Sequence, residues 1–488
     1  MSSSTDSPAL AHCRQQIQDS SLELIRFAWC DPHGQLRGKT LTRTAALRAL
    51  DAGVGMVSTL MLKDTSDRTA FKVFEPGLEQ TLPGFAFANN LLLRPIPESF
   101  QVLPWTAATG WLQCQPVFVD GQPVPLDTRA QLQQALARLA QHGLGMVCGL
   151  EIEFHIYRLR DPYHGAHQDP AQAAWPGLAP EVSLIHPGYQ LLSESWYDMA
   201  EEPLRIVQHT AQTLGLPLAS LEIELGPSQV EAVFDATDAL TAADNMVLFR
   251  SAVQQALRRA GYHATFMCRP PFEQIMSSGW HLHQSLMHLD SGRNAFMRDA
   301  GAPYSSVREA GHTLSELGTR YLAGLLHHAK GMTVMCTPTA NGFGRFRPNA
   351  LAPQSMVWGL DNRGAMLRVI GGAGDNATRI ENRLGEPAAN PYLYMASQIH
   401  AGLSGMAQDL QAPLATESPY AADGDPSLRI PTNLRDALQA LSADTAMVQG
   451  FGSDFIRYYS AIKLAEQQRF ESAEDAVEFQ RREYFSRI

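Results

Sequence analysis

The sequence predicts an α+β fold in two domains. Strand-like hairpins and blocks of helical periodicity follow one another without the regular βαβ alternation of a parallel sheet. The chain has 488 residues, which is more than one ordinary hydrophobic core serves. A turn-rich segment, Asp120–Pro125 (DGQPVP), separates a region of strands and turns from a region rich in helices. We therefore expect one domain at residues 20–122 and a second at residues 123–488.

The first domain is expected to consist mainly of strands joined by turns. The strands are predicted at 22–29, 90–95 and 110–119, with a turn at 31–34. The second domain is expected to begin with a helix. Asp127 or Thr128 provides its cap, the leucines between Leu132 and Leu139 share one face, and Gly143 ends it. Helical periodicity returns at 239–260, 314–330, 389–410, 436–441 and 453–479.

Composition excludes several classes of protein. The sequence is 45% hydrophobic and 18% charged, which is typical of a globular protein. Its net charge of −11 argues against nucleic acid as a partner, because phosphate binding requires a basic surface. No run of about 18 apolar residues predicts a membrane span. The N-terminal segment has no secretory pattern, and the six cysteines show no C-x-x-C spacing, so we expect a reduced, cytoplasmic protein.

Three strand-like segments place polar side chains on a face that is normally apolar. Residues two apart on a strand point to the same side of a sheet. In Glu151–Phe154 (EIEF), both carboxylates therefore point one way and both apolar groups the other. Trp280–Ser285 (WHLHQS) repeats this pattern with two imidazoles and a hydroxyl group, and Arg379–Arg383 (RIENR) with a carboxylate between two guanidinium groups. The pattern indicates a charged active-site floor.

The acidic members of this set favour a metal site. Six metal-type side chains fall on such segments: Glu151, Glu153, Glu224, Glu231, His281 and Glu381. One glutamate alone could be a buried ion pair, and a lone His-x-His pair is as often structural as functional. Several carboxylates that face one site repel each other unless cations neutralise them. Glutamate oxygens with a single imidazole suit Mg²⁺ or Mn²⁺, and two such ions are typical of phosphoryl transfer.

Arginines supply candidate anion ligands, because a planar guanidinium binds carboxylate or phosphate oxygens bidentately. The candidates are Arg345, Arg347, Arg363, Arg368, Arg379 and Arg383. For any one of them a solvated surface position is the simpler interpretation. That interpretation is weakest for Arg368, Arg379 and Arg383, which lie within strand-like segments.

These motifs resemble the glutamine synthetase superfamily. The resemblance rests on Glu224–Glu231 (ELGPSQVE), Ser278–Ser285 (SGWHLHQS), the flap-like segment 341–353, and residues 379–392. Asp31–Lys39 also resembles the N-terminal turn of the branch that contains γ-glutamylpolyamine synthetases. The resemblance covers the chain from about residue 20 onward.

The resemblance implies a β-grasp N-terminal domain and a catalytic domain with a curved antiparallel sheet flanked by helices. It implies a two-step reaction, in which ATP phosphorylates the γ-carboxylate of L-glutamate and an amine then attacks the acyl phosphate. Two or three Mg²⁺ or Mn²⁺ ions would assist. The family forms hexameric rings, commonly stacked as dodecamers, in which the N-terminal domain of one chain closes its neighbour's site.

Individual roles follow from the same resemblance. One metal would bind Glu153, Glu224 and Glu231, and the other Glu151, His281 and Glu381. ATP would contact His283, Ser285 and Arg379, with Arg363 and Arg368 on its phosphates. The glutamate and amine substrates would contact Glu153, Ser277, His281, Arg345, Leu351 and Arg383. The expected catalytic residues are Arg345, Arg363 and Asp64, the last lent to a neighbouring subunit near the amine.

Departures from the family pattern concern the amine. The flap glutamate, which helps to deprotonate ammonium, is replaced by Leu351, and an Asn-Gly pair by Met276 and Ser277. Trp280 is also larger than the usual methionine. We therefore expect an apolar monoamine, such as aniline or an alkylamine. The alternatives are a γ-glutamylpolyamine synthetase, a glutamine synthetase that uses ammonia and, more remotely, a non-catalytic scaffold or a guanidino-group kinase of related fold.

Overall fold

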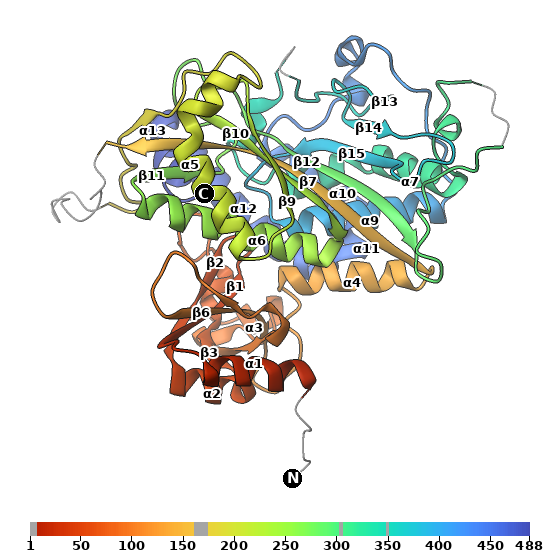
Figure 1. Ribbon diagram of the computed structural model, residues 1–488. Helices are drawn as coiled ribbons and strands as arrows, with labels where there is room; N and C mark the ends of the chain where they lie inside the picture. The colour runs from red at the N-terminus through yellow and green to blue at the C-terminus, as the bar shows by residue number, and fades with distance from the viewer. Residues whose placement is uncertain (1–6, 161–173, 302–305, 348–350) are drawn as a thin grey trace.

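The computed structural model describes residues 7–160, 174–301, 306–347 and 351–488. Two sheets organise the described chain, one of six strands in the N-terminal part and one of nine strands in the remainder (Figure 1). Helices cover the larger sheet, so the predicted α+β class is confirmed. The β-grasp assignment of the N-terminal domain stays a prediction.

In the described residues, the N-terminal part contains three helices and six strands. They are α1 (Pro8–Asp19), β1 (Leu24–Cys30), β2 (Leu36–Thr42), α2 (Arg43–Ala52), β3 (Val54–Val57), β4 (Asn90–Pro95), β5 (Gln101–Val102) and β6 (Thr109–Val117), with a short helix α3 (Leu78–Thr81) before β4. The strands lie in the order β2-β1-β6-β4-β3, with β5 paired to β6 and β1 parallel to β6. The helices α1 and α2 were not expected. Only Cys13 and Ile17 of α1 are buried, which is a weak periodic signal.

The second sheet is almost wholly antiparallel. Its strands are β7 (Leu144–Leu159), β8 (Val182–Leu184), β9 (Leu218–Ile223), β10 (Gln229–Asp238), β11 (Tyr262–Thr265), β12 (Trp280–His288), β13 (Trp358–Leu360), β14 (Leu367–Ile370) and β15 (Arg379–Gly385). Their order is β13-β14-β15-β12-β7-β10-β9, with β8 and β11 both paired to β7. Among these described strands, the pair β13–β14 is parallel. The expected antiparallel sheet is therefore present with one parallel edge pair.

Ten helices of the described chain follow the N-terminal part. They are α4 (Thr128–Ala140), α5 (Glu194–Thr213), α6 (Ala239–Arg259), α7 (Glu316–His327), α8 (Ala329–Cys336), α9 (Pro391–Ala407), α10 (Leu434–Ala443), α11 (Thr445–Phe451), α12 (Ser453–Glu471) and α13 (Ala476–Gln480). Asp127 caps α4 by accepting a hydrogen bond from the backbone N–H of Ala130, as predicted. The sequence interpretation missed α5, which contains Pro203 in its middle, where a proline removes a helical hydrogen bond.

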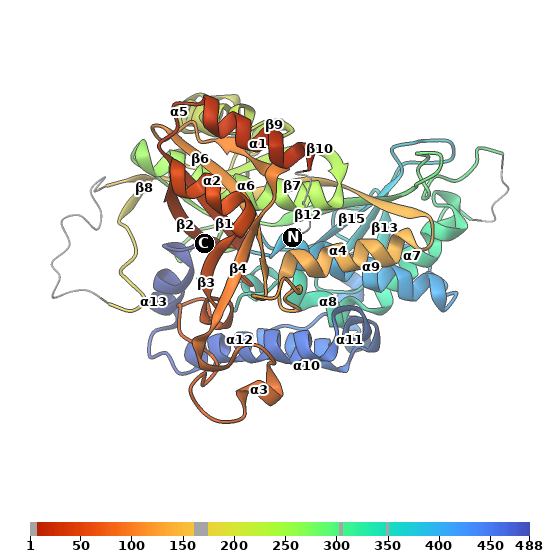
Figure 2. The same cartoon turned by 90° about the horizontal axis from the view of Figure 1, so that it is seen from below.

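Helices α4, α6 and α9 lie against one face of the large sheet (Figure 1). The C-terminal helix α12 lies beside the N-terminal part (Figure 2). There the Tyr458 hydroxyl of α12 donates to the carbonyl of Met61 at 2.5 Å, and the Tyr458 ring stacks on Phe71. The two parts of the chain are thus joined by buried contacts. Among the described residues, no helix is long and apolar enough to span a membrane.

Candidate active site

The face of the large sheet opposite the helices is lined with charged residues. On β7, Ile152 and Phe154 are fully buried, and the Phe154 ring packs edge-on against Phe249 of α6. Because side chains alternate along a strand, Glu151 and Glu153 point to the other face. The apolar positions of β7 therefore fix which way its carboxylates point.

The strand register brings the other predicted side chains beside these two. His281 of β12 pairs with Glu151, and Glu231 of β10 pairs with Glu153. One strand further out, Glu381 of β15 pairs with His283. Directly opposite residues lie about 4.5–5.5 Å apart at Cβ, so four strands place their polar side chains within reach of one another.

Three groups of carboxylate and imidazole atoms are close enough to share an ion. They are Glu153–Glu224–Glu231, Glu151–Glu231–His281 and Glu151–His283–Glu381. The first group is the set expected for one metal. The expected second set contained His281. In the structure His281 Nδ1 lies 3.5 Å from Glu151 and 3.8 Å from Glu381, whereas His283 Nε2 lies closer, 3.0 Å from Glu151.

The carboxylates of this face divide into two electrostatic classes. Burial and the neighbouring Glu224 raise the pKa of Glu153 to about 8, and burial, Glu153 and Glu224 raise the pKa of Glu231 to about 10. Burial alone would also raise the pKa of Glu151 and Glu381. Nearby His281 and His283 lower it for Glu151, and His281 and Arg383 lower it for Glu381. Negative charge is thus unbalanced where Glu153, Glu224 and Glu231 meet.

This donor set fits divalent cations. His281 Nδ1 and His283 Nε2 are buried and complete no hydrogen bond, although carboxylate oxygens lie close to both. Carboxylate oxygens with one or two imidazole nitrogens are ligands that suit Mg²⁺ and Mn²⁺. Bound cations would also remove the repulsion that raises the pKa of Glu153 and Glu231.

Two cavities flank the carboxylates. The first, of about 340 Å³, contains the three side chains expected to contact ATP directly, namely His283, Ser285 and Arg379. The second, of about 530 Å³, contains all six side chains expected for the glutamate and amine substrates, namely Glu153, Ser277, His281, Arg345, Leu351 and Arg383. Glu151 lines both. The charged floor therefore lies between two compartments, as transfer between two bound substrates requires.

The arginines are only partly where the sequence interpretation placed them. Arg363 lines the second cavity and not the first. Arg368 lines neither, because its guanidinium is paired with Asp361 and, at 3.0 Å, with Glu381. Arg363 and Arg368 thus lie away from the first cavity, and their expected contacts with ATP phosphates stay predictions. Arg379 does line the first cavity, where its Nε donates to His283 Nδ1 at 3.1 Å.

Two further arginines line the second cavity together with Arg363. Arg345 donates through Nη1 to the carbonyls of Leu384 and Gly385, which holds the side chain while it lines the cavity. Arg383 donates to Glu381 at 2.5 Å and lines the same cavity. Both are therefore fixed by their own chain at positions from which they can meet an anionic substrate.

Of the three apolar side chains expected at the amine end, only some line the second cavity. Leu351 and Met276 line the second cavity. Trp280 does not, because it is fully buried and packs edge-on against Tyr394. The expectation that Trp280 makes the amine end more apolar was therefore wrong. Residues 348–350 of the flap-like segment 341–353 lie outside the described residues.

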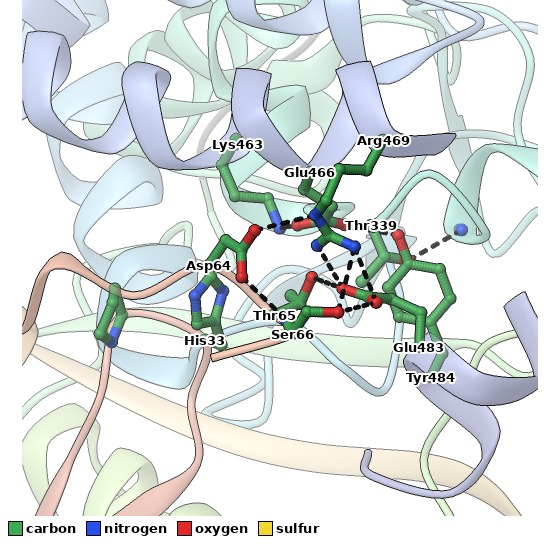
Figure 3. Close-up of polar contacts among 12 residues, drawn as sticks. His33, Asp64, Thr65, Ser66, Thr339, Lys463, Glu466, Arg469, Glu483 and Tyr484 are labelled. Atoms are coloured by element: carbon green, nitrogen blue, oxygen red, sulfur yellow. Dashed lines mark hydrogen bonds and ion pairs between the residues drawn. The ribbon is translucent and has the colours of Figure 1, made fainter. Parts of the chain in front are cut away.

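The expected role of Asp64 in a neighbouring site stays a prediction, and the structure gives its contacts within its own chain. Its carboxylate is buried, accepts backbone hydrogen bonds from Ser66 and Arg68, and lies 2.9 Å from Arg469 Nε of the same chain (Figure 3). Arg469 also contacts Glu483, which accepts hydrogen bonds from Ser66 and Thr65. Within its own chain, the Asp64 carboxylate is therefore balanced by a cation and by backbone hydrogen bonds.

Two polar residues of the second cavity were not singled out from the sequence. Glu222 of β9 lies opposite Glu231 of β10 in the sheet. It lines the second cavity together with Glu224. The sequence contains a pattern that could have identified Glu222, because residues 222–224 (EIE) repeat the Glu-Ile-Glu pattern of β7. Gln229 donates through Nε2 to Glu153 at 2.9 Å and to Ser278, and so orients that carboxylate. Nothing in its local sequence distinguishes it apart from the family motif.

Comparisons with known proteins agree with this geometry. The profile described as "Glutamine synthetase, catalytic domain" matches residues 125–482. The γ-glutamylanilide synthase of an Acinetobacter species is 35% identical over 96% of this chain and 94% of that protein. The γ-glutamylethanolamide synthetase GlnA4 of Streptomyces coelicolor is 28% identical over 97% of this chain and 94% of that protein. A solved GmaS/ADP complex is similar with a TM-score of 0.75 and 26% identity, over 96% of this chain and 98% of that one.

Proposed function

This chain belongs to the glutamine synthetase family and is a glutamate–amine ligase, and we propose that its amine is an apolar or aromatic monoamine such as aniline or an alkylamine. The product would be a γ-glutamylamide formed through γ-glutamyl phosphate. The observation that carries the proposal is the second cavity, where Leu351 and Met276 stand at the amine end in place of polar groups.

The proposed reaction has two balanced steps. An oxygen of the glutamate γ-carboxylate attacks the γ-phosphorus of ATP, and ADP leaves with the bond electrons. The amine nitrogen then attacks the carbonyl carbon of the acyl phosphate, inorganic phosphate leaves, and the nitrogen loses one proton. Both steps develop negative charge on oxygen, which preorganised positive groups stabilise.

The residues around the two cavities would bind different parts of the reacting complex. His283, Ser285 and Arg379 would bind the nucleotide, and Arg345 and Arg383 would hold the glutamate carboxylates. Divalent cations held by the glutamates would supply positive charge that stabilises the transferred phosphoryl group. Gln229 would keep Glu153 oriented through its 2.9 Å hydrogen bond. The ADP in a similar solved structure supports the use of a nucleotide.

The chemistry of an aniline suits this site. Its nitrogen is largely uncharged at neutral pH, so its attack requires less help with proton removal than ammonium does. A leucine at position 351 can neither attract a cation nor accept a proton. The similarity to a γ-glutamylanilide synthase supports the same choice.

One observation favours a second candidate. Glu222 lines the second cavity but belongs to none of the three carboxylate groups that could share an ion. Its carboxylate accepts a hydrogen bond from the Ser220 hydroxyl group at 2.8 Å. A carboxylate outside the ion-sharing groups would suit the second charge of an aliphatic polyamine, so a γ-glutamylpolyamine synthetase is the alternative. Ammonia is the remaining candidate, and the loss of the flap glutamate argues against it.

We further propose the family's assembly for this chain, namely a hexameric ring that stacks as a dodecamer in the cytoplasm. The proposed domains are 20–122 and 123–488, with the first closing a neighbour's site. Nucleic acid and membranes are not proposed partners. The net charge of −11 supports that view.

An amine panel tests the proposed function. Phosphate release would be measured with L-glutamate, ATP and Mg²⁺ or Mn²⁺ against aniline, isopropylamine, ethanolamine, putrescine and ammonia. We expect the highest kcat/KM with aniline or isopropylamine. A higher value for putrescine would select the polyamine alternative, and activity with ammonia equal to or above that with every amine would overturn the proposal.

A further inference from the structure

An unexpected apolar wall lines the second cavity. Leu191 and Leu192, in the loop between β8 and α5, line it together with Leu351 from the flap-like segment. These three side chains are 53%, 63% and 58% exposed. They are therefore not core residues, although they line a cavity whose floor carries several carboxylates.

The backbone of the wall adopts a sparsely populated conformation. Tyr189 and Leu192 have φ values of 58° and 55°, and Leu351 has a φ of 53°. This left-handed region is unfavourable for residues with a bulky side chain, and such strain collects at ligand clamps and active sites. Two separate segments thus hold exposed leucines in strained conformations toward one cavity.

The loop is also firmly anchored beside a metal-type ligand. The backbone N–H groups of Tyr189 and Leu192 donate to the carbonyls of Leu225 and Ile223, the two residues on either side of Glu224. At Gly188 a Cβ atom would lie 2.4 Å from the backbone nitrogen of Pro227, so a larger residue does not fit. The position of Leu191 and Leu192 is therefore set by the same strand connection that carries Glu224.

We propose that Leu191, Leu192 and Leu351 form a clamp that holds the hydrocarbon part of the amine and determines its selectivity. The clamp rests on the proposed function. An apolar amine would bury these leucines with its ring or alkyl group while its nitrogen faces the polar floor. A charged aliphatic chain would instead have to be desolvated against three leucines. The clamp thus favours an apolar body and disfavours a charged one.

Polar substitutions test the clamp. Leu191→Asn and Leu192→Asn are made separately, with Leu192→Met as the conservative variant of similar volume. Leu414→Asn is the matched control, because Leu414 is 57% exposed and does not line the cavity. Values of kcat/KM are measured for methylamine, isopropylamine and aniline, together with KM for glutamate and the thermal midpoint of each variant.

We expect each asparagine variant to lower the ratio of kcat/KM for aniline to that for methylamine by about 10- to 100-fold. The KM for glutamate is expected to stay within about twofold, methionine to restore the ratio, and the Leu414 control to match the wild type. An equal loss for every amine, which a merely structural role would give, would overturn the clamp. An unchanged ratio would overturn it too. No turnover with any amine in the wild type would instead overturn the proposed function.

Discussion

Two buried clusters of charge in this molecule differ in how their carboxylates are satisfied. Between the N-terminal part and the C-terminal helices, Asp64 and Glu483 share Arg469 and accept hydrogen bonds from Thr65 and Ser66 (Figure 3). On the large sheet, by contrast, three glutamates face one another. They are Glu153, Glu224 and Glu231.

The pKa values follow this difference in opposite directions. Burial alone would raise the pKa of Glu483, but Arg469 and the two hydroxyl groups hold it below its ordinary value. Burial and neighbouring carboxylates raise the pKa of Glu153 and Glu231. A cluster that its own chain balances is structural, whereas an unbalanced one indicates bound cations. Asp64 belongs to the balanced cluster within its own chain.

The largest predicted effect concerns the balanced cluster. Arg469→Met leaves Asp64 and Glu483 buried without their cation, so we expect a loss of about 3–5 kcal/mol in the free energy of unfolding. Arg435→Met is the matched control. The pair of Arg435 with Glu471 is solvent-exposed, so its loss should leave the free energy of unfolding almost unchanged. Denaturant titration measures both, and equal losses would contradict the comparison.

The unbalanced cluster should respond in the opposite way. Glu231→Gln removes a carboxyl group whose charged form is disfavoured by burial and by the neighbouring Glu153 and Glu224, so we expect the thermal midpoint without metal to stay the same or rise. The rate of phosphate release should nevertheless fall by about 10²-fold or more. Calorimetry in the presence of a chelator measures the thermal midpoint, and a turnover assay with Mn²⁺ measures the rate of phosphate release. A variant that is both active and destabilised would place Glu231 in the structural class.

A change of pH is expected to have a smaller effect on the stability of the metal-free protein and on its affinity for cations. Because the pKa of Glu153 rises from 4.5 to about 8 on folding, the metal-free protein should lose stability as the pH rises from about 4.5 to 8. Cations bind the deprotonated carboxylates, so their affinity should rise over the same interval. We expect Mn²⁺ to raise the thermal midpoint more at pH 8 than at pH 6. A larger increase at pH 6 would mean that protons do not compete at this site.

Much of the site could be predicted from the sequence, because the two-residue period of a strand is visible locally. Glu151 and Glu153 could be assigned to one face of β7, and the same period indicates Glu222 beside Glu224. The contacts of Asp64 could not be predicted, since its partner Arg469 lies 405 residues away along the chain. Such pairings depend on how the two parts of the molecule pack.

The fold shows the same division between local and tertiary information. The helices α4, α6 and α9 follow from caps and apolar periodicity. Helix α5 was missed because Pro203 interrupts its local signal, although it packs against α6 and β9. The wall formed by Leu191 and Leu192 depends on anchors at residues 223 and 225, so its place at the cavity is a property of the folded chain.

The transfer of isotope from glutamate to phosphate tests the central claim most directly. L-Glutamate with ¹⁸O at both γ-carboxylate oxygens would be incubated with ATP, Mg²⁺ and the best amine of the panel, and both products analysed by mass spectrometry. We predict one ¹⁸O in the released phosphate and one in the γ-glutamylamide, because the acyl phosphate breaks at its carbonyl carbon. Unlabelled phosphate, or an amide that keeps both labelled oxygens in a free carboxylate, would contradict the account.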